Sequence, residues 1–193
     1  MLIENEFVVP ESIDKVWAFF NDIPQVASSL PGTELTQDLG NDEYTGKVAI
    51  AMGPVRLSFD GDAKVLERDE AAKKLVVDGK GADEKGRGNA SMVLTANLSS
   101  TPKGTKAHMT MDLTLSGAAA QYGRGMVADV TSVLIGQFAD NAQKRIDALE
   151  RGLDVSNMTA KPASGLAIGI AAAKLALMRV FRRFFLPYRP QVR

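Results

Sequence analysis

The residue types that most often carry out catalysis or hold metals are scarce in this sequence. Its 193 residues include no cysteine and one histidine, which excludes thiol nucleophiles, cysteine-rich metal sites and any Ser-His-Asp triad not built on His108. His108 falls on the polar side of an alternating stretch, so it is a poor catalytic candidate. A metal site would need carboxylates alone, and Asp60, Asp62 and Asp112 share that polar side, where acids are ordinarily solvated. We therefore expect neither a metal site nor a catalytic residue.

Apolar side chains dominate the opposite side of the same stretches, and four of the chain's eight methionines are among them. Methionine is flexible and polarizable, so it adapts to irregular or mobile apolar partners. The set predicts either an ordinary core or, at its wider end, the lining of a cavity. The residues on this side are Val48, Ile50, Met52, Leu57, Phe59, Met92, Leu94, Met109, Met111 and Leu113.

Two polar residues could orient a ligand among these apolar groups. Tyr44 shares the apolar side and could offer a phenolic hydrogen bond, or it could end a strand with its hydroxyl in water. Arg124 stands between glycines at the expected start of a helix, which would place its cation near the cavity mouth. Its alternative role is a surface ion pair, for instance with Asp129.

Period-2 alternation between Tyr44 and Leu115 predicts an antiparallel meander with one polar face. The expected strands cover 44–52, 55–65, 75–77, 90–98 and 107–115, with a first strand over 3–9, and make a curved sheet of about six strands. The glycine-rich stretch from Gly79 to Gly88 precedes no helix and lacks the Lys-Ser/Thr of a P-loop, so we interpret it as a flexible hairpin tip. The positions on the apolar side of the predicted strands contain no His, Asp or Glu.

Helical patterns lie on both sides of the meander. Short helices are expected over 10–20 and 22–30, the second stopped by Pro31-Gly32, and a long one over 124–151. The long helix is the only candidate to cover the apolar face of the sheet. One side of it carries Val127, Val130, Leu134, Phe138, Ala142, Arg145 and Leu149.

This order of elements resembles the α+β helix-grip fold of START and Bet v 1-like proteins, in which a curved antiparallel sheet wraps a long C-terminal helix around a cavity. Trp17 and Phe20 from the first helix, with Met126, Val130 and Leu134 from the long one, would close the mouth. The candidate ligand-binding set is then Trp17, Phe20, Tyr44, Ile50, Met52, Phe59, Met92, Leu94, Met109, Met111, Arg124, Met126, Val130 and Leu134.

Several spaced landmarks make the resemblance narrower. They are Leu30-Pro-Gly, Gly46 to Pro54, Phe59-Asp-Gly, Gly79 to Asp83 and Ser116 to Met126. In this order they resemble the CoxG family of carbon monoxide dehydrogenase subunits, within the START-like SRPBCC superfamily, over residues 1 to about 150. The resemblance implies a non-catalytic helper of aerobic carbon monoxide dehydrogenase of the molybdenum hydroxylase type, with a role in attaching that enzyme to the membrane.

The zero net charge hides an asymmetry along the chain. All 23 acidic residues lie between Glu4 and Asp154, where 16 Lys and Arg leave a formal charge of −7. From Lys161 onward there are seven cations and no acid. Such a split predicts that the two parts meet different partners. We therefore expect a ligand-binding domain over 1–151, a linker over 152–162 and a basic tail over 163–193.

The tail has the pattern of an interfacial membrane helix. Its uncharged run is too short to span a bilayer, which takes about 20 residues. Cations face the polar side of a helical wheel, each worth roughly 1 kcal/mol near anionic lipid. The alternative is an amphipathic helix packed on another protein or on a second copy. The predicted membrane-binding residues are Leu166, Ile170, Lys174, Leu177, Arg179, Phe181, Arg182, Arg183, Phe184 and Phe185.

These patterns, together with what the family resemblance implies about the dehydrogenase, suggest three functions. The first is a carrier on the cytoplasmic face of the cell membrane that takes a lipophilic quinone, menaquinone or ubiquinone, from the bilayer and delivers it to the dehydrogenase, without a covalent cofactor or nucleic acid. The start of the chain lacks the features of a secretion signal, which agrees with a cytoplasmic location. The second is an adaptor with a solid core and no ligand. The third is a START-like cyclase or dehydratase, which would need an acid-base pair inside the cavity.

Overall fold

The computed structural model describes residues 1–52, 55–156, 158 and 160 of the chain. The predicted membrane-binding residues of the tail lie outside this described part. The elements are β1 (Leu2–Val9), α1 (Ile13–Asn21), α2 (Ile23–Ser29), β2 (Thr33–Gly40), β3 (Glu43–Met52), β4 (Val55–Asp69), β5 (Lys74–Asp83), β6 (Asn89–Thr101), β7 (Gly104–Leu115), the 3-10 helix η1 (Gly117–Gln121) and α3 (Arg124–Glu150).

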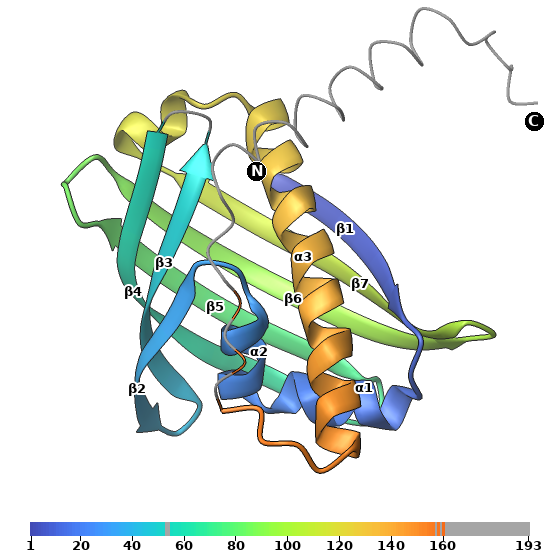
Figure 1. Cartoon of the computed structure of the whole chain (residues 1–193). Helices are drawn as coiled ribbons and strands as arrows, with labels where there is room; N and C mark the ends of the chain where they lie inside the picture. Colours follow the sequence, from blue (N-terminus) through green and yellow to red (C-terminus); the bar gives the residue numbers. More distant parts are fainter. Residues whose placement is uncertain (53–54, 157, 159, 161–193) are drawn as a thin grey trace, which may run out of the picture.

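The strands form one antiparallel sheet in the order β1-β7-β6-β5-β4-β3-β2. Figure 1 shows that the sheet is strongly curved and that α3 lies across its concave face. The long helix packs most closely on β1 and then on α2 and α1. The predicted arrangement of a curved antiparallel sheet with a long C-terminal helix is therefore confirmed.

The two short helices stand next to the C-terminal end of α3 (Figure 1). α1 begins at Ile13 rather than at the predicted residue 10, because the N–H of Glu11 bonds the carbonyl of Val9 in a turn. Asp22 separates the helices: its carboxylate accepts a 3.1 Å hydrogen bond from the N–H of Gln25 and so caps α2. This cap lets the chain change direction within one residue.

The first half of the glycine-rich stretch is strand, so its interpretation as a hairpin tip holds only for the second half. β5 runs through Gly79 and Gly81, and the hairpin is confined to residues 84–88. Gly81 pairs in register with Gly61, and a Cβ on Gly61 would stand 2.0 Å from the carbonyl oxygen of Lys80. Glycine is required at this crossing because the two backbones approach too closely for a side chain.

The edge strand β2 was not among the predicted strands. Its pairing with β3 shifts register twice, between Leu35 and Gln37 and between Asp38 and Gly40, and most of its side chains are exposed. Bulges of this kind disrupt alternation, and they also protect an edge strand against pairing with another chain. A sequence pattern based on strict alternation cannot detect such a strand.

Two separate clusters of buried apolar residues hold the sheet to the helices. The larger lies toward α1 and the C-terminal half of α3, and contains Val9, Val16, Trp17, Phe19, Phe20, Tyr44, Val65, Leu75, Ala96, Leu98, Ala107, Met109, Phe138, Ala142 and Ile146. The smaller lies toward η1 and contains Ala51, Leu57, Phe59, Ala119 and Val130. None of the helices in the part of the chain that the structure describes has the length and apolar character needed to cross a membrane.

Candidate ligand-binding site

The middle of the concave face carries apolar side chains that are only half-buried. Met92 pairs in register with Leu113, and Leu94 with Met111, on the face that points toward α3. All four are half-buried. Val48 is half-buried in the same way, although its partner across the sheet is the buried Phe59. The wall of a ligand cavity is typically apolar and accessible, and this part of the inner face, between the two buried clusters, has both properties.

Four of the predicted ligand-binding residues lie in the larger cluster. Trp17, Phe20, Tyr44 and Met109 are all buried there. The ring of Phe20 meets that of Phe138 edge to face, with 6.0 Å between the centroids, which is a packed aromatic contact. For Met109 this packing agrees with the core alternative. Trp17, Phe20 and Tyr44 are buried in the same cluster, and Tyr44 is only 8% exposed.

The other predicted residues divide among three places. Phe59 and Val130 are buried in the smaller cluster, and Ile50 and Leu134 pack against it. Met92, Leu94 and Met111 form the half-buried middle described above. Met126 is exposed at the start of α3, and the side chain of Met52 lies outside the described part of the structure.

Arg124 lies on the β1 side of α3. Its guanidinium donates a 2.9 Å hydrogen bond to the carbonyl oxygen of Leu2, and the side chain is exposed. This contact fastens the first turn of the helix to the first strand. Asp129, the alternative partner suggested by the sequence, is buried one turn further along.

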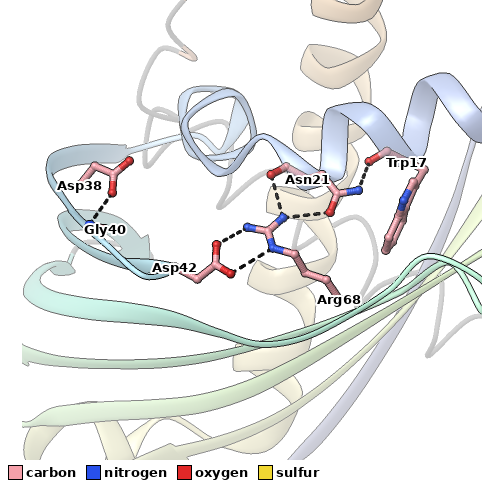
Figure 2. Close-up of polar contacts among 6 residues, drawn as sticks. All are labelled: Trp17, Asn21, Asp38, Gly40, Asp42 and Arg68. Atoms are coloured by element: carbon pink, nitrogen blue, oxygen red, sulfur yellow. Dashed lines mark hydrogen bonds and ion pairs between the residues drawn. The ribbon is translucent and has the colours of Figure 1, made fainter.

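An arginine that the alternating pattern did not single out joins three elements at the α1 end of the sheet (Figure 2). The guanidinium of Arg68 donates to both carboxylate oxygens of Asp42, at 2.7 and 3.3 Å, and to the backbone and side-chain oxygens of Asn21, at 2.8 and 2.9 Å. We call these three residues the Arg68 clamp. It holds the β2–β3 turn against the end of α1, and Arg68 keeps the pKa of the Asp42 carboxyl below its usual range.

A bulge explains why Arg68 points into the concave side. The β4–β5 register shifts between Val65 and Glu67, so that Arg68 pairs with the buried Leu75. Leu66, at the bulge, is exposed. Next to the clamp, burial raises the pKa of Tyr44, and the negative charges of Asp38 and Asp42 add to that shift. The Tyr44 hydroxyl therefore stays protonated at neutral pH.

A carboxylate lies on the face of the sheet that points toward α3, at the end away from the Arg68 clamp. The sequence pattern predicts no Asp on that face. Asp83 pairs in register with Phe59 and is buried. Its oxygens accept hydrogen bonds from the guanidinium of Arg87, at 2.7 and 2.8 Å, and from the N–H groups of Ser58, Lys85 and Arg87. These donors, Arg87 first, hold the pKa of Asp83 well below its usual range, so the group stays ionised and closes the β5–β6 hairpin.

Two hollows on the surface do not coincide with the predicted site. One, of about 480 Å³, lies on the outer face of the sheet and is lined by the polar side chains of Asp60, Asp62, Lys80, Asn89, Ser91 and Thr114 together with smaller residues. The other, of about 400 Å³, lies between α1 and the last turn of α3, beside Phe19, Ile146 and Leu149. Neither is lined by a residue of the candidate ligand-binding set.

After α3 the chain returns to the body. The guanidinium of Arg145 is buried and donates to the side chain of Gln25 at 2.5 Å, to the carbonyl of Val155 at 3.2 Å and to the carbonyl of Met158. The N–H of Ala160 donates to the carbonyl of Ser28 at 2.9 Å. Residues 153–156, 158 and 160, which we call the return segment, are thus tied to α2.

Comparison with known proteins identifies relatives by sequence and by shape. Residues 6–147 match the family model of CoxG, a subunit of carbon monoxide dehydrogenase. No curated protein matches the chain in sequence.

Solved structures of the same shape have low sequence identity. A conserved protein from Geobacillus kaustophilus has a TM-score of 0.68 at 19% identity, covering 76% of this chain and 95% of its own. A protein from Rhizobium leguminosarum has a TM-score of 0.54 at 14% identity, covering 75% and 95%. The Zhui aromatase/cyclase from a Streptomyces species has a TM-score of 0.50 at 14% identity, covering 81% and 98%. These similarities show the helix-grip fold, a curved antiparallel sheet around a long C-terminal helix.

Proposed function

Because the chain belongs to the CoxG family of carbon monoxide dehydrogenase subunits, we propose that it is a non-catalytic accessory protein of aerobic carbon monoxide dehydrogenase. In this proposal it anchors the enzyme at the cytoplasmic face of the cell membrane. It also binds a lipophilic quinone, menaquinone before ubiquinone, between the sheet and α3, and carries it between membrane and enzyme.

One observation supports the ligand most directly. The inner face between the two buried clusters is lined by Met92, Met111 and Leu113, which are apolar and yet half-buried. A solid core would bury such side chains, because each fully buried apolar side chain contributes about 1.5–3 kcal/mol relative to an exposed one. A bound apolar molecule would supply that burial instead.

The chemistry of the lining favours a quinone over a charged metabolite. A quinone has a planar, mostly apolar ring and an isoprenoid tail, and flexible methionines can fit around both. Two charged groups on the concave side, Arg68 and Asp83, already have partners at the two ends. Oxidation of carbon monoxide by water releases two electrons and two protons, and a quinone that takes up both becomes a quinol, so it is a suitable acceptor for the enzyme.

The arrangement gives less support to catalysis by this chain. A cyclase of the kind found on the same fold would need a group that exchanges a proton near neutral pH. Asp83 remains ionised under its five donors, and burial keeps Tyr44 protonated. The purely structural adaptor is the stronger alternative, since Trp17, Phe20, Tyr44 and Met109 already form a packed core.

Native mass spectrometry of the full-length protein, purified from membranes in mild detergent, tests the proposal. We expect a bound species with the mass of the host's quinone. The adaptor predicts protein without a ligand. Quenching of Trp17 fluorescence gives a second measurement, because Trp17 is the chain's one tryptophan and an added quinone bound in the cavity would reduce its emission. An unliganded protein with unchanged Trp17 emission would contradict the quinone proposal.

A further inference from the structure

The position at which the basic tail leaves the body is set by hydrogen bonds rather than by a loose linker. Arg145 is only 3% exposed, and it holds the carbonyls of Val155 and Met158 as well as the side chain of Gln25. Asn141, one turn earlier on α3, donates a 3.0 Å hydrogen bond to the carbonyl of Ser29. These contacts join α3, α2 and the return segment in one unit.

The return segment ends against α2. Val155 is buried, and the Ala160 N–H bonds the Ser28 carbonyl in the last turn of that helix. In Figure 1 this helix stands at the same end of the molecule as the C-terminal end of α3, away from η1. The chain therefore leaves the described body at α2.

The surface around this point differs in charge from the rest of the body. Residues 23–33, which comprise α2 and the turn after it, contain no charged residue, and neither do residues 155–160. The remaining body carries the whole excess of seven negative charges. We call the surface formed by α2 and residues 155, 156, 158 and 160 the α2 face; Asp154, the charged residue of the return segment, is not part of it. An uncharged surface is the part of an acidic protein that an anionic lipid surface repels least.

Exposed apolar side chains lie close to the α2 face. Met158, in the return segment, is 37% exposed, and Leu149, which lines a surface hollow together with Gln25 of α2, is 45% exposed. Apolar side chains beside an uncharged surface are suited to the boundary between headgroups and acyl chains.

The length of chain beyond Ala160 makes the connection short. The amphipathic pattern of the tail begins at residue 163, and three residues span at most about 10 Å. A helix lying on the membrane from residue 163 would therefore keep Ala160, and the α2 segment bonded to it, within about 10 Å of the lipid surface.

From these observations we propose that the α2 face lies against the lipid surface, and that Arg145 is the positioning residue that sets this orientation. In this orientation the outer face of the sheet would point away from the lipid. This inference rests on the proposed role of the tail as an anchor, and it adds the face that the body presents.

Single cysteines can test the orientation, because the chain has no native cysteine. Full-length Ser28→Cys and Met158→Cys variants carry a fluorescent label on the α2 face, whereas Thr114→Cys and Ala120→Cys carry it on the outer sheet face and on η1. Each is mixed with vesicles of phosphatidylglycerol and phosphatidylcholine whose acyl chains are brominated. We expect at least twofold stronger quenching at positions 28 and 158 than at 114 and 120.

The outcomes separate this inference from the proposed anchor. Vesicle binding with equal quenching at all four positions, or with the strongest quenching at position 114 or 120, overturns the orientation alone. Failure of the labelled proteins to float with the vesicles overturns the anchor and the orientation together.

A variant at Arg145 tests its role as a positioning residue. Arg145→Met should leave flotation unchanged while the label at 158 loses its excess quenching, and the exposed Lys144→Met, which removes the same charge, should retain it. A merely structural role for Arg145 would lower the melting temperature without changing the quenching pattern, which overturns the assignment. If Arg145→Met does not fold, Ala160→Pro, which removes the donor to Ser28, should give the same loss.

Discussion

Met92 and Met109 occupy the same face of neighbouring strands but differ in burial. Met109 is packed in the larger cluster, whereas Met92 is half-buried in the middle of the concave face. A cavity predicts that the two positions respond differently to a larger side chain. Met92→Trp should fill open space and leave the melting temperature nearly unchanged, whereas Met109→Trp should overpack a closed core and cost about 1–3 kcal/mol.

Thermal unfolding and native mass spectrometry of both variants measure this difference. Met92→Trp should also lose the bound quinone, because the indole would occupy its place. Equal destabilisation by the two substitutions, together with a wild-type protein that carries no ligand, would indicate a solid core and favour the adaptor.

Asp83, beside the turn of the β5–β6 hairpin, should make the stability of the fold depend on pH in the acid range. The unfolded carboxyl takes up its proton near pH 3.8, and the native one only at lower pH, because Arg87 and three backbone N–H groups stabilise the charged form. Between these values the unfolded chain binds more protons than the native chain. The stability contributed by Asp83 is therefore present above about pH 5 and is lost as the pH falls below 3.8.

We expect Asp83→Asn to lower the melting temperature at neutral pH and to flatten its decline between about pH 5 and pH 3. The exposed Asp62→Asn removes one carboxylate from the outer face and serves as the control. Melting curves recorded across this pH range decide the matter, and parallel declines in all three proteins would contradict the role given to Asp83.

At the scale of elements, the Arg68 clamp connects a turn, a strand and a helix that are far apart in the sequence. The turn it holds is unusual, since Asn41 and Asp42 both have positive φ. Arg68→Met would leave the Asp42 carboxylate and the Asn21 carbonyl without these donors, at a cost of about 1 kcal/mol because water reaches the partly exposed carboxylate. Because the clamp is local, the loss should open the β2–β3 hairpin before the rest of the sheet.

Hydrogen exchange read by mass spectrometry should therefore show faster exchange over 33–52 and at the end of α1, with little change in β6 and β7. Arg56→Met, at an exposed position of β4, is the matched control. Uniform acceleration across the sheet would mean that Arg68 supports global stability rather than this hairpin.

The elements that the sequence predicts well are those whose side chains repeat regularly. Alternation in β3, β4, β6 and β7 and the long amphipathic pattern of α3 were sufficient, because one face of each is buried and the other is wet. The pattern fails where backbone geometry replaces alternation. Two register shifts conceal β2, the approach of β4 to β5 places glycines inside a strand, and the bulge at Leu66 turns Arg68 inward.

The sequence predicted which side chains face α3, but not which of them are packed in a core. Sequence parity identified Met92, Leu94 and Met111 on the inner face, and the structure leaves them half-buried. Alternation along the strand could not distinguish these residues from Met109, because side chains of a packed core and of a cavity wall alternate in the same way. Arg145 gave a usable signal, a cation among the apolar residues of α3, and the structure explains it by the carbonyls of the return segment.

At the scale of the molecule, the return segment changes where the body should end. Cutting after residue 160 keeps every partner of Arg145, whereas cutting after residue 151 removes the carbonyls of Val155 and Met158 and leaves a buried cation with fewer acceptors. We expect residues 1–160 to melt like the full chain and residues 1–151 to lose about 1–3 kcal/mol. Equal melting of the two truncations would show that the return segment contributes nothing to the fold.

The same truncation separates the acidic body from its basic tail. Without residues 161–193 the protein carries a charge of −7 and should no longer float with anionic vesicles, because the seven cations that attract it are gone. Charge reversal of Arg179, Arg182 and Arg183 in the full chain should weaken flotation most at low salt, where the Debye length is longest. A body that still floats after truncation would show that lipid binding resides in the folded domain, and the orientation of the α2 face would then have to arise from the body itself.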